Sequence, residues 1–92
     1  MIVYNVTFSV DQEIADEWLS WMKNKHVPEL LKAGTFQAYK ILKVLSHDDE
    51  KTFSFAVQLY STSIEKVEQY HHSSPHPFGD KVVGFPTLLE EV

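Results

Sequence analysis

The chain has 92 residues, of which 43% are hydrophobic and 23% are charged, and its formal net charge is −5. This length predicts one domain over residues 1–92, and the composition is that of a globular rather than a disordered protein. The chain has no cysteine and no arginine. These absences exclude disulfides and thiolate chemistry, and together with the acidic balance they argue against a surface that binds nucleic acid.

The first residues argue against a targeting segment. Residues 1–6 contain no basic group, and Asn5 interrupts their hydrophobicity, so we expect no signal peptide. No apolar run approaches the roughly 18 residues that a membrane helix needs. A cytoplasmic location is the default expectation.

Residues 2–10 alternate between apolar and polar side chains, which predicts a strand with one buried face. The apolar side chains of this strand are Ile2, Tyr4, Val6, Phe8 and Val10. Asp11 follows as a candidate N-cap, because its carboxylate can accept backbone N–H bonds from a helix that begins there.

The predicted first helix carries an apolar stripe at about 100° per residue. The stripe consists of Ile14, Trp18, Trp21 and Met22. His26 falls inside it, four residues past Met22. We therefore expect an ionisable ring to point toward the core or toward a pocket that lines it.

Pro28 disfavours helical geometry at Val27 and favours a fresh helical start, and Gly34 is a candidate C′ residue for the short helix that follows. Residues 36–45 predict a second strand with apolar side chains on both faces, and residues 52–60 predict a third strand beyond a polar hairpin loop.

Residues 62–65 (Thr-Ser-Ile-Glu) match a capping box ahead of a second helix, and the last strand is expected from about Lys81 to Leu89. The resulting order β-α-β-β-α-β predicts an α+β, ferredoxin-like fold. Right-handed connections give a four-stranded antiparallel sheet in the order 4-1-3-2 with both helices on one face. The last strand is then an edge, which suits Pro86 because proline has no N–H for the ladder.

The second and last strands are apolar on both faces, which an open sheet with one hydrated face does not require. We therefore expect the second face to be covered. A twofold copy of the same chain is the simplest cover, so the sequence predicts a homodimer.

The order of aromatic, histidine, proline and glycine residues resembles the first helix and second strand of dimeric α/β-barrel proteins. The residues that carry this resemblance are Trp18, Trp21, His26, Val27, Pro28, Gly34 and Tyr39. That superfamily includes the ethyl tert-butyl ether degradation (EthD) family and the antibiotic-biosynthesis monooxygenases.

A closer resemblance is to a family of small proteins common in Bacteroidetes, a domain of unknown function, and it is carried by residues 1–7 and 87–92. It covers nearly the whole chain and implies the fold and a dimer, but no activity. The chain departs from these relatives at residues 71–80, where they carry a longer helical segment. That departure puts in doubt any pocket wall built from this segment.

The candidate ligand-binding residues are Trp18, Met22, His26 and Tyr39, which would line a pocket between the first helix and the sheet. His26 could orient or polarise an oxygenated substrate, or it could only hold the helix in place by a hydrogen bond to a backbone carbonyl. A catalytic role would need a second polar group that faces His26, for which Tyr4 and Tyr39 are the candidates. Trp18 and Trp21 could stack on a flat ligand or serve as core anchors.

His71, His72 and His76 have spacings found in zinc sites, but Pro75 prevents a continuous helix there and cysteine is absent. We interpret them as a solvated turn and expect neither a metal nor a cofactor. Two function classes remain open. The first is a dimeric module that binds a small apolar or aromatic ligand or serves assembly. The second is a cofactor-independent monooxygenase or isomerase of the EthD type that uses His26.

Overall fold

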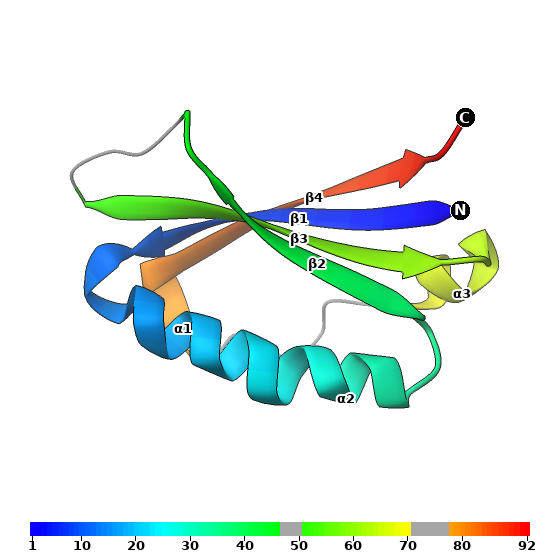
Figure 1. Ribbon diagram of the computed structural model, residues 1–92, viewed down its shortest axis with the longest axis horizontal. Helices are drawn as coiled ribbons and strands as arrows, with labels where there is room; N and C mark the ends of the chain where they lie inside the picture. Colours follow the sequence, from blue (N-terminus) through cyan, green and yellow to red (C-terminus); the bar gives the residue numbers. More distant parts are fainter. Residues whose placement is uncertain (47–50, 71–77) are drawn as a thin grey trace.

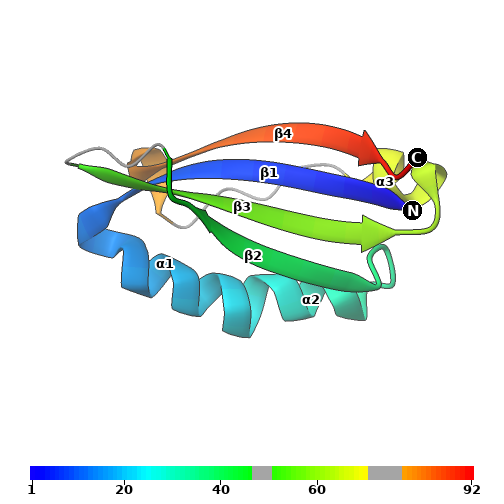
Figure 2. The same ribbon diagram turned by 45° about the horizontal axis from the view of Figure 1, so that its top comes forward.

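A computed structural model describes residues 1–46, 51–70 and 78–92 of the chain. Its centre is one four-stranded antiparallel sheet in the order β2-β3-β1-β4 (Figures 1 and 2). The strands are β1 (Ile2–Asp11), β2 (Ala38–Val44), β3 (Thr52–Ser61) and β4 (Val82–Glu90). This is the predicted order 4-1-3-2 read from the other edge, and β4 is the edge strand that carries Pro86. The predicted fold is confirmed.

One face of the sheet is covered by a long helical segment made of successive short elements (Figure 1). They are a 3-10 turn, η1 (Gln12–Ile14), then α1 (Ala15–Trp21), a π turn, η2 (Met22–His26), and α2 (Val27–Lys32). Two further helices lie in the second half of the chain: α3 (Ile64–Gln69) and the 3-10 turn η3 (Gly79–Lys81). Val67 of α3 joins the same buried cluster as the first segment, so α3 packs on the same face of the sheet.

The ends of the helices follow the predicted capping chemistry, with one correction. The carboxylate of Asp11 accepts the backbone N–H of Glu13 at 3.0 Å, as expected for an N-cap. Gly34 has φ +83°, the left-handed conformation that ends α2. For α3, the predicted box placed the cap at Thr62, but Ser63 is the N-cap, and its hydroxyl accepts the N–H of Lys66 at 3.3 Å.

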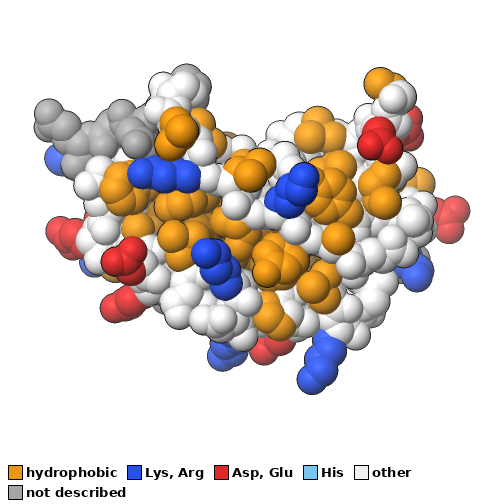
Figure 3. Space-filling model, viewed as in Figure 1, with side chains coloured by type: hydrophobic (Ala, Val, Ile, Leu, Met, Phe, Trp, Pro, Cys, Tyr) orange, Lys and Arg blue, Asp and Glu red, His pale blue; other side chains and the backbone are white. Residues whose placement is uncertain are grey.

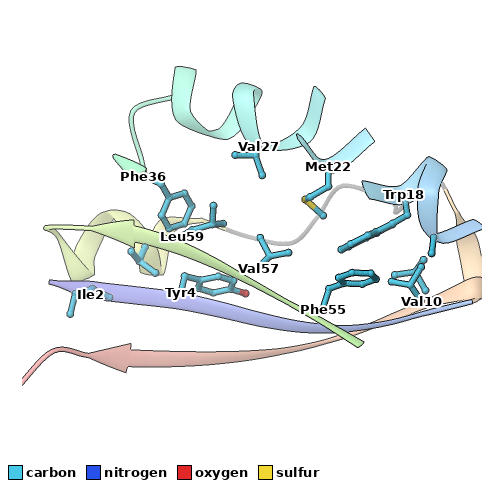
Figure 4. Packing of buried hydrophobic residues seen from close by; sticks show 13 residues of the cluster. Ile2, Tyr4, Val10, Trp18, Met22, Val27, Phe36, Phe55, Val57 and Leu59 are labelled. Atoms are coloured by element: carbon cyan, nitrogen blue, oxygen red, sulfur yellow. The ribbon is translucent and has the colours of Figure 1, made fainter. Parts of the chain in front are cut away.

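The core lies between the sheet and the helices. Figure 4 shows Trp18, Met22 and Val27 pointing from the helical segment toward side chains of β3, with Phe36 closing one end. The buried hydrophobic residues are Ile2, Tyr4, Val10, Ala15, Trp18, Met22, Val27, Phe36, Phe55, Val57, Leu59, Val67 and Val82. Three alternate residues of β3, Phe55, Val57 and Leu59, belong to this set, which is the strand period of two expected for a sheet with one covered face.

The helix does not break before Pro28, contrary to the sequence-based expectation. Val27 is helical, with φ −63° and ψ −45°. In an α-helix the ring of a proline clashes with the carbonyl four residues earlier, here that of Asn24. The π turn directly before Pro28 has hydrogen bonds that reach five residues back, which moves that carbonyl away from its α-helical position. The widened turn therefore lets the helix continue through the proline.

Candidate functional site

The structure does not place the four candidate ligand-binding residues in equivalent surroundings. Trp18 and Met22 are 0% and 1% exposed, so both lie within the core. His26 is half-buried, and Tyr39 is 40% exposed on the edge strand β2. Of the four side chains, only those of His26 and Tyr39 have substantial exposed surface.

Trp18 packs between aromatic rings of the sheet. Its ring stacks on that of Phe55 at 5.3 Å and lies 5.1 Å from that of Phe8, both measured between centroids. Met22 lies one turn further on and fills the next layer above the sheet (Figure 4). Such contacts are typical of core anchors, and burial of a tryptophan in this way stabilises a fold by several kcal/mol.

The π turn explains why His26 is not on the core-facing stripe. The backbone N–H of Val27 donates to the carbonyl of Met22, so the turn that begins at Met22 contains one residue more than an α-helical turn. Val27, which is fully buried, takes the core position that an α-helical wheel assigns to His26. His26 is displaced by one residue toward the flank of the helix.

On that flank the imidazole of His26 stacks on the indole of Trp21, with centroids 4.6 Å apart and planes inclined by 16°. The same indole meets the ring of Phe78 edge to face at 5.8 Å, just before η3. The three rings form a cluster at the side of the helical segment. We call it the Trp21 cluster.

Burial lowers the pKa of His26 below its ordinary value of 6.5, and the negative charge of Glu29 opposes this shift. Burial disfavours the charged form of an imidazole, so the ring is predominantly neutral at pH 7. A neutral imidazole can accept a proton or donate its single N–H.

The two tyrosines considered as polar partners for His26 lie in different settings. Tyr4 is buried, with its ring 6.2 Å from Phe36 and 5.7 Å from Tyr70. Tyr39 pairs with Leu59 across β2 and β3, so its side chain is on the helix side of the sheet.

The histidines at positions 71, 72 and 76 lie outside the described residues, and the prediction about them is untested. In the ranges that the structure does describe, no three histidine, aspartate or glutamate side chains gather in a way that could hold a metal ion.

A second candidate surface is the sheet face opposite the helices, here called the open face. Its side chains come from residues of odd number in β1 and β4 and of even number in β2 and β3. Several large apolar side chains on it are exposed, up to 62% for Phe85. The exposed large hydrophobic residues of the open face are Leu42, Val83, Phe85 and Leu89.

The strand register arranges the open face in four rows that cross all four strands, because directly paired residues point to the same side. In the order β2, β3, β1, β4, the first row is Ala38, Tyr60, Val3 and Leu89. The second row is Lys40, Gln58, Asn5 and Thr87. The third is Leu42, Ala56, Thr7 and Phe85, and the fourth is Val44, Ser54, Ser9 and Val83.

The second row, which we call the polar row, consists entirely of polar side chains, whereas the other three rows end in apolar residues on both edge strands. Figure 3, in the view of Figure 1, takes in the β2 edge and the helical segment together, and it shows apolar side chains gathered across the middle of the molecule with lysines scattered among them. In these four described rows Lys40 is the only charged residue, although the chain as a whole carries a net charge of −5. The four rows of the open face are thus depleted of charge, while Asp11 lies beyond the fourth row, at the end of β1.

These features define a small α+β domain with a ferredoxin-like sheet, one face of which is covered by helices. The chain belongs to the family described as a domain of unknown function (DUF4286), whose model matches residues 1–92. Neither the curated proteins nor the solved structures contain a match to the chain. Among the described residues, no helix has the length and the apolar character needed to cross a membrane.

Proposed function

We propose that the protein is a homodimeric assembly module in which two copies pack through their open faces. The apolar, charge-depleted open face is the observation that carries this proposal. A monomer in water would leave Leu42, Phe85 and Leu89 hydrated, and burial of apolar area stabilises an assembly by about 25 cal/mol per Å².

The dimensions of the open face support a second copy as its cover. Four strands about 4.8 Å apart and about nine residues long, at about 3.4 Å per residue, make a flat area on the order of 600 Å², to which side-chain relief adds. Specific dimers bury about 800 Å² on each partner. The open face of a second copy has the same area, so it can cover this face and leave little of it exposed.

The charge distribution also supports self-association. Two acidic molecules repel each other, and repulsion is smallest where the approaching surfaces carry the fewest charges. Because the four rows include one lysine and no acidic residue, they are a surface through which two identical acidic chains can meet.

The test is the molar mass by light scattering across a dilution series. We expect a dimer at micromolar concentration and a monomer for Leu42→Lys, which places a charge at an apolar end of the third row, inside the proposed contact area. Leu45→Lys is the matched control, since Leu45 is three residues away, 81% exposed and beyond the end of β2. A monomeric unvaried chain, or equal effects of the two substitutions, would contradict the proposal.

A small apolar or aromatic ligand beside His26 is our second candidate function. The observation that favours it is the Trp21 cluster, where a half-buried, neutral imidazole stacks on an indole at a π turn. Turns of this kind occur frequently at functional sites. Of the four original candidates, His26 and Tyr39 remain available to a ligand, while Trp18 and Met22 support the fold beneath it.

Nuclear magnetic resonance with indole as the probe tests this second candidate. We expect saturable shifts of the His26 ring and of the Trp21 indole N–H, and smaller shifts in His26→Ala. Uniform, non-saturating shifts across the surface would overturn it. We do not extend the proposal to an EthD-type monooxygenase or isomerase, because Tyr4 is engaged in its own aromatic cluster and the matching family has no described activity.

A further inference from the structure

We infer that the twofold axis of the proposed homodimer runs along the strands, between β1 and β3, so that β2 of each copy lies over β4 of the other. This inference rests on the proposed packing of two open faces. For the two faces to meet, the twofold axis must lie in the plane between them. The simple choices are an axis along the strands and an axis across them.

An axis along the strands places each row over the same row of the second copy in reversed order. The polar row then meets itself, with Lys40 over Thr87 and Gln58 over Asn5. The apolar ends of the other rows meet each other. These apolar pairs are Ala38 with Leu89, Leu42 with Phe85, and Val44 with Val83.

An axis across the strands matches the rows less well. If it passes through the polar row, Lys40 lies over Lys40 of the second copy, and like charges placed together in an interface are strongly disfavoured. If it passes elsewhere, the polar row lies over an apolar row, and the amide groups of Asn5 and Gln58 at its centre are buried without partners in the second copy. The axis along the strands avoids both penalties.

The hydrogen bonds at the centre of the face are consistent with this arrangement. The Nδ2 of Asn5 donates to the Oγ1 of Thr7 at 3.3 Å, and the Oε1 of Gln58 accepts from the hydroxyl of Tyr60 at 2.9 Å. The Oδ1 of Asn5 can therefore accept a further hydrogen bond, and the Nε2 of Gln58 can donate one. The two groups are complementary, and the axis brings them together twice. Twisted sheets pack at about 30° to each other, so the match is closest at this centre.

A charge placed at position 87 tests the axis. Within one copy Lys40 and Thr87 are three strands apart, about 14 Å, so they form no direct ion pair. In the proposed dimer a glutamate at 87 would face Lys40 of the second copy on both edges. We expect Thr87→Glu to lower the dissociation constant of the dimer about threefold to tenfold at low salt, which is the range for two exposed ion pairs.

Sedimentation equilibrium measures this constant, with two comparison variants. Ser20→Glu adds the same charge on the exposed side of α1 and should not tighten the dimer. Thr87→Glu combined with Lys40→Gln should lose the gain, as should 1 M salt. A dimer that Thr87→Glu weakens or leaves unchanged would overturn the axis and leave the homodimer standing. A chain that stays monomeric at every concentration would overturn the homodimer itself.

Discussion

The backbone N–H of Val27 donates to the carbonyl oxygen of Met22, five residues earlier in the chain. This one hydrogen bond defines the π turn that brings Val27 into the core and moves His26 to the flank beside Trp21. The turn therefore separates two roles within six residues. Met22 and Val27 stabilise the fold, and His26 is left partly exposed with a neutral ring.

Deletion of Asn24 tests the structural role of the π turn. The deletion would make Met22 and Val27 four residues apart, so an α-helical turn could keep both in the core. It would also restore the clash between the Pro28 ring and the helix backbone, so we expect a loss of about 3 kcal/mol. In a Pro28→Ala background the same deletion should lower stability little or raise it, as urea unfolding would show.

The matched control for this experiment is deletion of Glu17, an exposed residue of α1. No widened turn lies there, so the deletion would rotate Ala15 away from the core while Trp18 stays in place. It should destabilise the protein in both backgrounds. If the two deletions cost the same with Pro28→Ala, the π turn would have no special role.

Stability should depend on pH through His26. Its pKa is lower in the folded chain than the ordinary 6.5 of the unfolded chain, because burial disfavours the imidazolium. The unfolded state therefore binds more protons in the window below about 6.5. The favourable contribution of the neutral His26 ring to the free energy of unfolding is therefore fully present above pH 6.5. It is lost as the pH falls toward the folded-state pKa.

The measurement is the free energy of unfolding as a function of pH for the unvaried chain and for His26→Phe. Phenylalanine keeps a ring that can stack on Trp21 and removes the titration, and the other histidines are common to both proteins. The free energy of unfolding of the unvaried chain minus that of His26→Phe should decrease as the pH falls. Parallel curves would show that His26 has the same pKa in the folded and unfolded states.

Gly84→Ala should destabilise the sheet by about 1–3 kcal/mol, the usual range for overpacking. Gly84 pairs with Phe8, and a Cβ built at Gly84 would lie 2.9 Å from the Phe8 ring. The ring cannot move freely, because it packs 5.1 Å from Trp18. In a Phe8→Ala background the same substitution should cost much less, because only the approach to Cγ1 of Val6 at 3.2 Å remains. Equal losses in the two backgrounds would exclude this clash as the cause.

Ser63→Ala should cost about 1 kcal/mol, and Thr62→Ala should cost less, in thermal or urea unfolding. Ser63 caps the backbone of α3 through Lys66, whereas the hydroxyl of Thr62 accepts a bond from the side chain of exposed Gln37 at 3.3 Å. The reverse order of the two losses would favour Thr62 as the cap, as the sequence pattern had indicated.

Much of the fold could be predicted because its signals are local in the sequence. The alternation in residues 2–10 and 52–60 identifies strands whose alternate side chains are buried, and Asp11 and Gly34 act as the predicted caps. Pro86 was correctly interpreted as an edge residue, since an edge strand has N–H groups that need no partner in the ladder. The predicted homodimer and the predicted ligand site stay predictions.

The candidate site was less predictable, because one extra residue in a helical turn decides whether His26 or Val27 faces the core. The assumption of 3.6 residues per turn placed His26 in the core stripe, and only the spacing of Pro28 hinted at a wider turn. Burial of Val27 in place of an imidazole avoids the desolvation of a polar ring, which offsets the poorer geometry of a π turn.

The sequence by itself therefore determined the order of the elements, the buried face of each central strand and the ends of the first helical segment. Each of these depends on neighbouring residues and on backbone preferences. The tertiary structure alone decided that Trp18 and Met22 are core while His26 is on the flank, and that Lys40, Gln58, Asn5 and Thr87 form one polar row. Those arrangements depend on strand register and on packing between segments far apart in the chain, where a shift of one residue moves every side chain to another face.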